Sequence, residues 1–111
     1  MANTNVPEQG IMLNHVAYVD GTPIQSGIFL PALKGSNQRI TIEATTTGNA
    51  QVDELDDDGH FRDRTGPLAV AANDPTYIVF ENDVFNMRLT FTPTNFPGNV
   101  FAQANSMPKG T

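Results

Sequence analysis

"FNMRLTF", residues 85–91, carries the clearest folding signal in the chain. Apolar and polar side chains alternate along it, and the apolar positions are Phe85, Met87, Leu89 and Phe91. Successive side chains of a β-strand point to opposite faces, so this period predicts a strand with one face in the core and Arg88 on the other. A strand of this kind needs a second sheet to cover its apolar face.

Further short strands are predicted on the N-terminal and C-terminal sides of this stretch. "RITIEATTT" (39–47) alternates in the same way, with Ile40, Ile42 and Ala44 on its apolar face. The other candidates, rich in β-branched and aromatic residues, span residues 11–19, 24–30, 50–55, 60–64, 76–81 and 100–104. No segment has a convincing helical period. We therefore predict an all-β fold, an antiparallel β-sandwich of about eight short strands with Ig-like or jelly-roll-like topology.

Local chemistry predicts where the chain turns. "DGTP" (20–23) is expected to reverse the chain so that the strand after it pairs with the strand before it. "GN" (48–49) is expected to form a tight turn into the next strand. Asp58 and Gly59 predict a hairpin, because glycine accepts positive φ and aspartate tolerates it.

The composition bounds the size and the partners of the protein. Its 111 residues predict one domain, with an extended arm at 1–10, a sandwich at 11–105 and a tail at 106–111. A formal net charge of −6 disfavours binding to nucleic acid or to an anionic membrane. With no cysteine there is no disulfide or thiolate chemistry. No apolar run approaches the roughly 20 residues of a membrane span, and we expect a soluble chain without a secretion signal.

"VDELDDDGHF" (52–61) is the most acidic stretch, and calcium is the first interpretation to test. With Gly59 at the sixth position of an EF-hand loop, the residues at positions one, three and five are Glu54, Asp56 and Asp58. The twelfth position is then Thr65, which cannot supply a bidentate carboxylate, and the sequence predicts no flanking helices. An EF-hand is excluded, whereas a calcium site of another kind stays open.

The competing interpretation places these acids at a hairpin tip that projects into water or toward a basic partner. Crowded carboxylates resist a dry environment, and Arg62 and Arg64 are expected to offset part of the charge. A catalytic carboxylate pair is not expected, because glycoside hydrolysis requires two groups across a cleft. His60 could join Asp58 at a metal, whereas His15 is expected to be a packed or edge side chain.

The sequence contains no catalytic signature, so we expect no enzymatic activity, no cofactor and no resident metal. Ser26, Ser36 and Ser106 lie outside any nucleophile-elbow or triad pattern, and phosphate-binding loops, dinucleotide fingerprints and zinc-protease motifs are absent. Abundant Thr, Asn and Gln suit polar interfaces. They also leave open a small carbohydrate-binding or adhesion module.

The order of the features has a counterpart in a known group of proteins. A glycine-bearing strand leads to an I-x-I strand in "GIFLPALKGSNQRITIEATTT", an Asp-rich hairpin follows, and "NMRLTF" carries an arginine in a later strand. This order, over about residues 24–104, resembles the small β-sandwich virion structural proteins of tailed bacteriophages. The residues that match are Asp56, Asp57, Asp58, Gly59, Phe61 and Arg88.

The resemblance implies a non-enzymatic capsid decoration, or cement, protein, made in the host cytoplasm and located on the capsid surface. Such a protein binds across major capsid protein subunits in many copies or as a homo-oligomer, and a neck or tail component is the alternative. Extended termini suit contacts with neighbours. The expected interaction residues are Asn3, Asn5, Pro7, Glu8, Asp56, Asp57, Asp58, Pro108 and Lys109.

Overall fold

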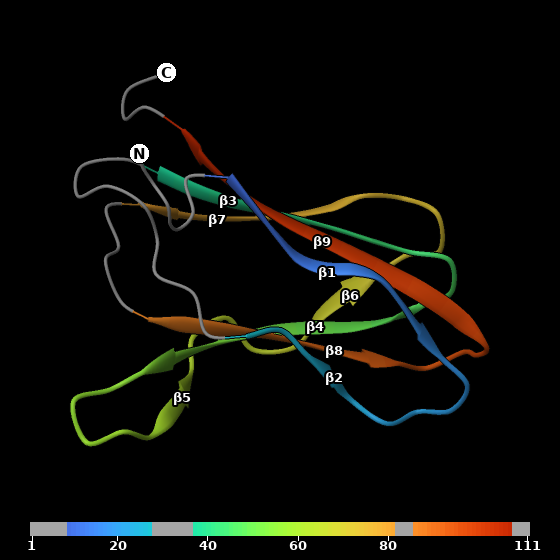
Figure 1. Cartoon of the computed structure of the whole chain (residues 1–111), viewed down its shortest axis with the longest axis horizontal. Coiled ribbons are helices and arrows are strands. Elements are labelled where there is room, and N and C mark those ends of the chain that lie inside the picture. Colours follow the sequence, from blue (N-terminus) through green and yellow to red (C-terminus); the bar gives the residue numbers. More distant parts are fainter. Residues whose placement is uncertain (1–8, 28–36, 82–85, 108–111) are drawn as a thin grey trace.

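The computed structural model describes residues 9–27, 37–81 and 86–107, and these residues form nine β-strands (Figure 1). The strands are β1 (Gln9–Tyr18), β2 (Ile24–Gln25), β3 (Asn37–Ala44), β4 (Gly48–Leu55), β5 (Phe61–Asp63), β6 (Leu68–Val70), β7 (Thr76–Glu81), β8 (Met87–Pro93) and β9 (Gly98–Met107). Across these residues the structure has no helix, and so none that could cross a membrane.

The strands form two facing sheets, which confirms the predicted antiparallel sandwich (Figure 1). One sheet has the order β1-β9-β3-β7 and the other the order β2-β8-β4-β5, with β6 also paired to β4. Pairing runs from the chain ends inward: β1 with β9, β2 with β8, β3 with β7, and β4 with β5 and β6. This nested pairing is that of a jelly roll, one of the topologies that the sequence left open.

The core lies between the sheets and uses the side chains that the alternating pattern predicts. Met87, Leu89 and Phe91 of β8 are fully buried, while Phe85 lies outside the described residues. On β3 the predicted apolar face is likewise buried, at Ile40, Ile42 and Ala44. β4 contributes Ala50 and Val52, which pair in register with Phe91 and Leu89 of the same sheet.

The predicted hairpin between residues 11–19 and 24–30 is wrong. β1 pairs with β9, whereas β2 pairs with β8 in the opposite sheet. The turn between them, in which Thr22 N donates to Asp20 Oδ1 at 3.0 Å, carries the chain from one sheet to the other. Turn chemistry therefore marked the reversal correctly but not the partner, because nested pairing joins strands that lie far apart in sequence.

The predicted tight turn at Gly48–Asn49 is also wrong, because both residues belong to β4. The connection from β3 occupies residues 45–47. A Cβ atom at Gly48 would lie 2.5 Å from Phe91 Cζ and 2.7 Å from the Thr92 carbonyl oxygen. The absence of a side chain thus serves the close approach of β4 to β8 rather than a turn.

Two strands extend beyond their predicted bounds. β1 begins at Gln9 rather than Ile11, and β9 continues to Met107 rather than ending at Ala104. β6, three residues long, was not predicted. The predicted interaction residues of the two termini all lie outside the described residues. They are Asn3, Asn5, Pro7, Glu8, Pro108 and Lys109.

Candidate functional site

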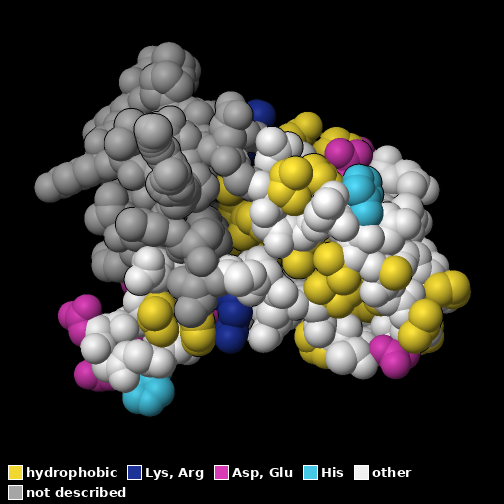
Figure 2. Space-filling view, viewed as in Figure 1, with side chains coloured by type: hydrophobic (Ala, Val, Ile, Leu, Met, Phe, Trp, Pro, Cys, Tyr) yellow, Lys and Arg dark blue, Asp and Glu magenta, His cyan; other side chains and the backbone are white. Residues whose placement is uncertain are grey.

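The predicted hairpin at Asp58–Gly59 is confirmed and forms the most prominent projection among the described elements. β4 and β5 pair antiparallel, with Leu55 opposite Phe61, and Gly59 has a φ of 84°. The hairpin extends away from the body of the sandwich at the lower left of Figure 1. Figure 2 shows acidic side chains and a histidine gathered at this end of the molecule.

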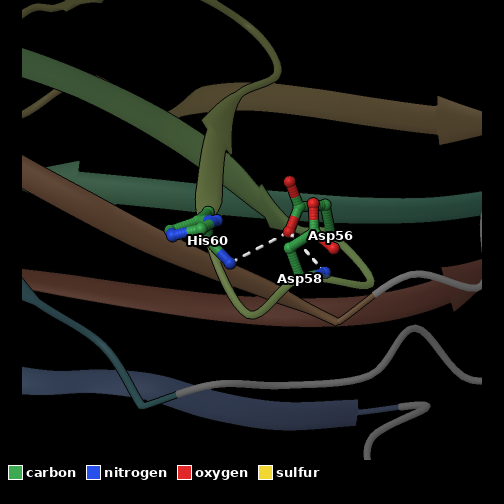
Figure 3. Close-up of side chains that lie close together, drawn as sticks. All are labelled: Asp56, Asp58 and His60. Atoms are coloured by element: carbon green, nitrogen blue, oxygen red, sulfur yellow. Dashed lines mark hydrogen bonds between the residues drawn. The ribbon is translucent and has the colours of Figure 1, made fainter.

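Asp56 holds the hairpin loop in shape. Its Oδ1 accepts hydrogen bonds from the backbone nitrogens of Asp58 (3.0 Å) and His60 (2.9 Å), as Figure 3 shows. Its Oδ2 accepts a hydrogen bond from Arg62 Nε at 2.5 Å. Two backbone bonds close the same loop, from Asp56 N to the His60 carbonyl and from Gly59 N to the Asp56 carbonyl. The backbone N–H of His60 and then the Arg62 guanidinium lower the pKa of Asp56 below its ordinary value.

The loop also brings three potential metal ligands together. Ligand atoms of Asp56, Asp58 and His60 lie within 4.8 Å of one another, the one such grouping in the described part of the chain. An ionised carboxylate offers about four acceptor positions, and Asp56 already uses three of them on N–H donors. A cation here would have to displace the bonds that shape the loop. The grouping is therefore explained as a turn closed by Asp56, and it carries no metal assignment.

The prediction that all of the acids in residues 53–58 lie at the hairpin tip is wrong. Asp53 is only 9% exposed and sits on β4, at the base of the hairpin. Its Oδ1 accepts a hydrogen bond from Gln51 Nε2 at 2.8 Å, and its Oδ2 lies 3.6 Å from a terminal nitrogen of Arg88. Asp53 and Arg88 are directly opposed in the β4–β8 register, on the outer face of the sheet. Sequence reasoning missed this pair because the register between β4 and β8 has no local signal.

Arg88 also contacts the aromatic residue that follows the hairpin. Its guanidinium carbon lies 3.7 Å from the centroid of the Phe61 ring, a cation–π arrangement. The Arg88 Nε is buried and has no hydrogen-bond partner among the described residues. Phe61 and Arg88, 27 positions apart in the sequence, are thus in contact. The contact ties β5 to β8 across β4 and stiffens the base of the hairpin.

The arginines of the return strand offset part of the acidic charge, as predicted. Arg64 lies 2.6 Å from a carboxylate oxygen of Glu54, and Arg62 pairs with Asp56. Asp57 and Asp58 are exposed, and neither side chain has an ion-pair partner within the described ranges. The result is a hairpin with three ion pairs toward its base and two free carboxylates at its tip.

Other candidates from the sequence have different surroundings. The Ser26 hydroxyl donates to the Gly27 carbonyl at 2.8 Å and accepts from Leu89 N at 3.0 Å, so it links β2 to β8. His15 is exposed on β1 and packs against Phe101. It also lines a pocket, with polar side chains from three other segments, that no motif in the sequence indicated.

Comparisons with family models, with curated proteins and with solved structures found no match to the chain. Jelly rolls occur in viral capsid, lectin and cupin domains, so this fold by itself does not select a function. The hairpin and the pocket are therefore the features of the described residues from which a function can be inferred.

Proposed function

We propose that the protein is a non-enzymatic structural component of a tailed-bacteriophage virion, a decoration or cement protein that binds across major capsid protein subunits. The resemblance over residues 24–104 supports this role, and the jelly roll is compatible with it. The observation that carries the proposal is the projecting β4–β5 hairpin, which has a stiff base and two exposed carboxylates, Asp57 and Asp58, at its tip.

The hairpin suits contact with a basic surface on a neighbouring protein. Its loop is preorganised by three bonds to Asp56, so little conformational entropy is lost when a partner binds. The free carboxylates supply charge complementarity, which favours the correct partner and the rate of association. Each contact is small. A protein present in many copies on a capsid gains affinity when several contacts form together.

The acidic residues of the hairpin have no catalytic role in this function. Asp56 is bound to the loop backbone and to Arg62, and Glu54 is paired with Arg64. Asp57 and Asp58 share one exposed environment, which does not create the divided acid and base roles of a carboxylate pair. The net charge of −6 directs the protein toward basic protein partners and away from nucleic acid and anionic membranes.

The experiment is reconstitution of the purified chain with expanded phage heads that lack it. We expect stoichiometric co-sedimentation and a higher melting temperature of the heads. The double variant Asp57→Asn/Asp58→Asn should bind more weakly and with a smaller dependence on salt. Asp74→Asn, which removes an exposed acid before β7, is the matched control and should bind normally.

The possible results separate the parts of the proposal. No binding to any virion particle would refute a virion role. Binding to necks or tails but not to heads would replace the cement role with the alternative location. Normal head binding by the double variant would remove the hairpin tip as the contact.

A further inference from the structure

A pocket of about 370 Å³ opens on the outer face of the β1-β9-β3-β7 sheet. Glu43 and Phe101 are register partners on β3 and β9, and their neighbours Ala44 and Val100 are buried on the core side. Side chains alternate along a strand, so Glu43 and Phe101 face outward. The residues that line the pocket are His15, Glu43, Ala44, Thr45, Asn73, Asn99 and Phe101.

An irregularity in β1 places His15 over this pocket. Leu13 pairs with Ala102 and Val16 with Val100, so two residues of β1 lie opposite the single residue Phe101. His15 adopts a φ of 51°, and its ring lies 5.0 Å from the Phe101 ring with 33° between the planes. Bulges of this kind re-aim a side chain and are common next to functional sites. The bulge thus places the His15 ring against the Phe101 ring at the pocket.

A second residue with positive φ also lines the pocket. Asn73 has a φ of 59°, and its backbone nitrogen donates to the Ala44 carbonyl at 2.7 Å. Among the described residues, His15 and Asn73 are the two non-glycine residues with positive φ, and both line this pocket. Positive φ at a non-glycine residue persists only where the surrounding structure holds it in place, and such residues cluster at ligand sites.

The polar side chains around the pocket are available to a ligand. No side-chain hydrogen bond joins His15, Glu43, Asn73 or Asn99 to another residue of the described ranges. Thr45 has a supporting role, because its Oγ1 accepts from Asn99 N at 3.0 Å and so fixes the position of Asn99. The free carboxylate of Glu43 and the free carboxamides of two asparagines thus line the same pocket as the Phe101 ring.

We infer that this pocket binds a neutral saccharide, one or two sugar rings in size. A sugar has hydroxyl edges, which Glu43 and the carboxamides of Asn73 and Asn99 can hydrogen-bond. It also has C–H faces, which suit the face of Phe101. A phosphate or another anion is disfavoured by Glu43 and by the net charge of −6. A purely apolar ligand would leave the free polar groups without partners.

The test is a glycan array probed with the full chain, followed by NMR titration of the best neutral mono- or disaccharide. We expect shifts in the ring signals of His15 and Phe101. Glu43→Gln keeps the side-chain shape but replaces a charge-assisted hydrogen bond with a neutral one, and Phe101→Ala removes the aromatic ring. Each variant should therefore weaken binding by about tenfold or more. Tyr77→Ala is the matched control: it removes an exposed aromatic ring from β7 of the same sheet, outside the pocket, and should bind as wild type does.

The absence of any neutral saccharide among the array hits would overturn the inference, as would a titration of the best hit that leaves the ring signals of His15 and Phe101 unshifted. Undiminished binding by the Glu43 and Phe101 variants would also overturn it, because the sugar would then lie elsewhere. The melting temperature of Glu43→Gln separates loss of binding from loss of fold. The site is independent of the virion role, so Glu43→Gln should bind phage heads normally and the Asp57/Asp58 variant should bind the sugar normally.

Discussion

Asp56 of the hairpin and Glu43 of the pocket are both carboxylates near the surface, but their surroundings differ. Asp56 accepts three hydrogen bonds from its own loop and from Arg62. Glu43 has no hydrogen bond or ion pair within the described residues and stands beside the Phe101 ring. The hairpin is the conspicuous feature of the sequence, yet three of the five acids in residues 53–58 are engaged in hydrogen bonds or ion pairs within the protein. The pocket has no sequence signal, yet its polar groups are free. Density of charged residues is thus a poor guide to which group is open to a ligand.

The largest expected effect is that of a core substitution, which should destabilise the hairpin and the pocket together. Phe91 is fully buried and contacts the Tyr18 ring, with centroids 5.7 Å apart. Phe91→Ala should lower the free energy of unfolding by about 3–5 kcal/mol, through lost burial and a residual cavity. Denaturant unfolding measures this loss. Phe96→Ala, at a side chain that is 49% exposed, is the control. A loss below about 1 kcal/mol for Phe91→Ala would contradict the placement of Phe91 in the packed core between the sheets.

A substitution at the base of the hairpin should have a smaller effect, and it should leave the pocket unchanged. Asp53→Ala leaves the Arg88 guanidinium without its carboxylate and the Gln51 amide without its acceptor, at a site that is mostly buried. We expect a loss of about 2 kcal/mol in unfolding free energy and larger hydrogen-exchange rates in β4 and β5. Asp58→Ala, at the exposed tip, should change neither quantity. Altered NMR signals from His15 and Phe101 in the Asp53 variant would contradict the separation.

Acid should loosen the hairpin loop and leave the fold in place. The pKa of Asp56 is lowered from 3.8 by the His60 N–H and then by Arg62, so the folded carboxylate resists protonation. Its stabilising effect is therefore present above pH 3.8 and is lost as the pH falls through the lower folded value. NMR titration of the His60 amide measures this transition. Asp56→Asn keeps an acceptor but removes the titrating group, so it should abolish the transition; persistence in that variant would contradict the assignment.

The smallest expected effect is that of calcium. Because Asp56 is already engaged with N–H donors, adding calcium or EDTA should leave the melting temperature unchanged. A rise in melting temperature with calcium that Asp58→Ala abolishes would show that the loop rearranges around a cation. The hairpin would then resemble the pocket, because its side chains would be free to bind a ligand.

Much of the local structure could be predicted from the sequence. Alternation predicted the buried faces of Met87, Leu89 and Phe91 and of β3, because a strand shows its side chains to each face in turn. Aspartate and glycine at 58–59 predicted the hairpin, because the need for positive φ is local. Both signals depend on residues that are neighbours along the chain.

Pairing between distant strands could not be predicted in the same way. Turn signals suggested that β1 pairs with β2, whereas the jelly roll pairs β1 with β9. The candidate site shows the same limit. Its tip was predicted, but the contacts of Arg88 with Asp53 and Phe61 depend on the registers of β4 with β8 and with β5. The pocket depends on a bulge and on a loop that meet only in the folded chain.

The sequence by itself determined that this chain forms short strands, which side chains those strands bury, and where the acidic hairpin turns, since period and turn chemistry act over a few residues. Only the tertiary structure decided which strands pair, why Asp53 is buried beside Arg88, and that His15, Glu43, Asn73 and Asn99 meet around Phe101. The physical reason is that these contacts join residues far apart in sequence, and their formation depends on packing two whole sheets against each other.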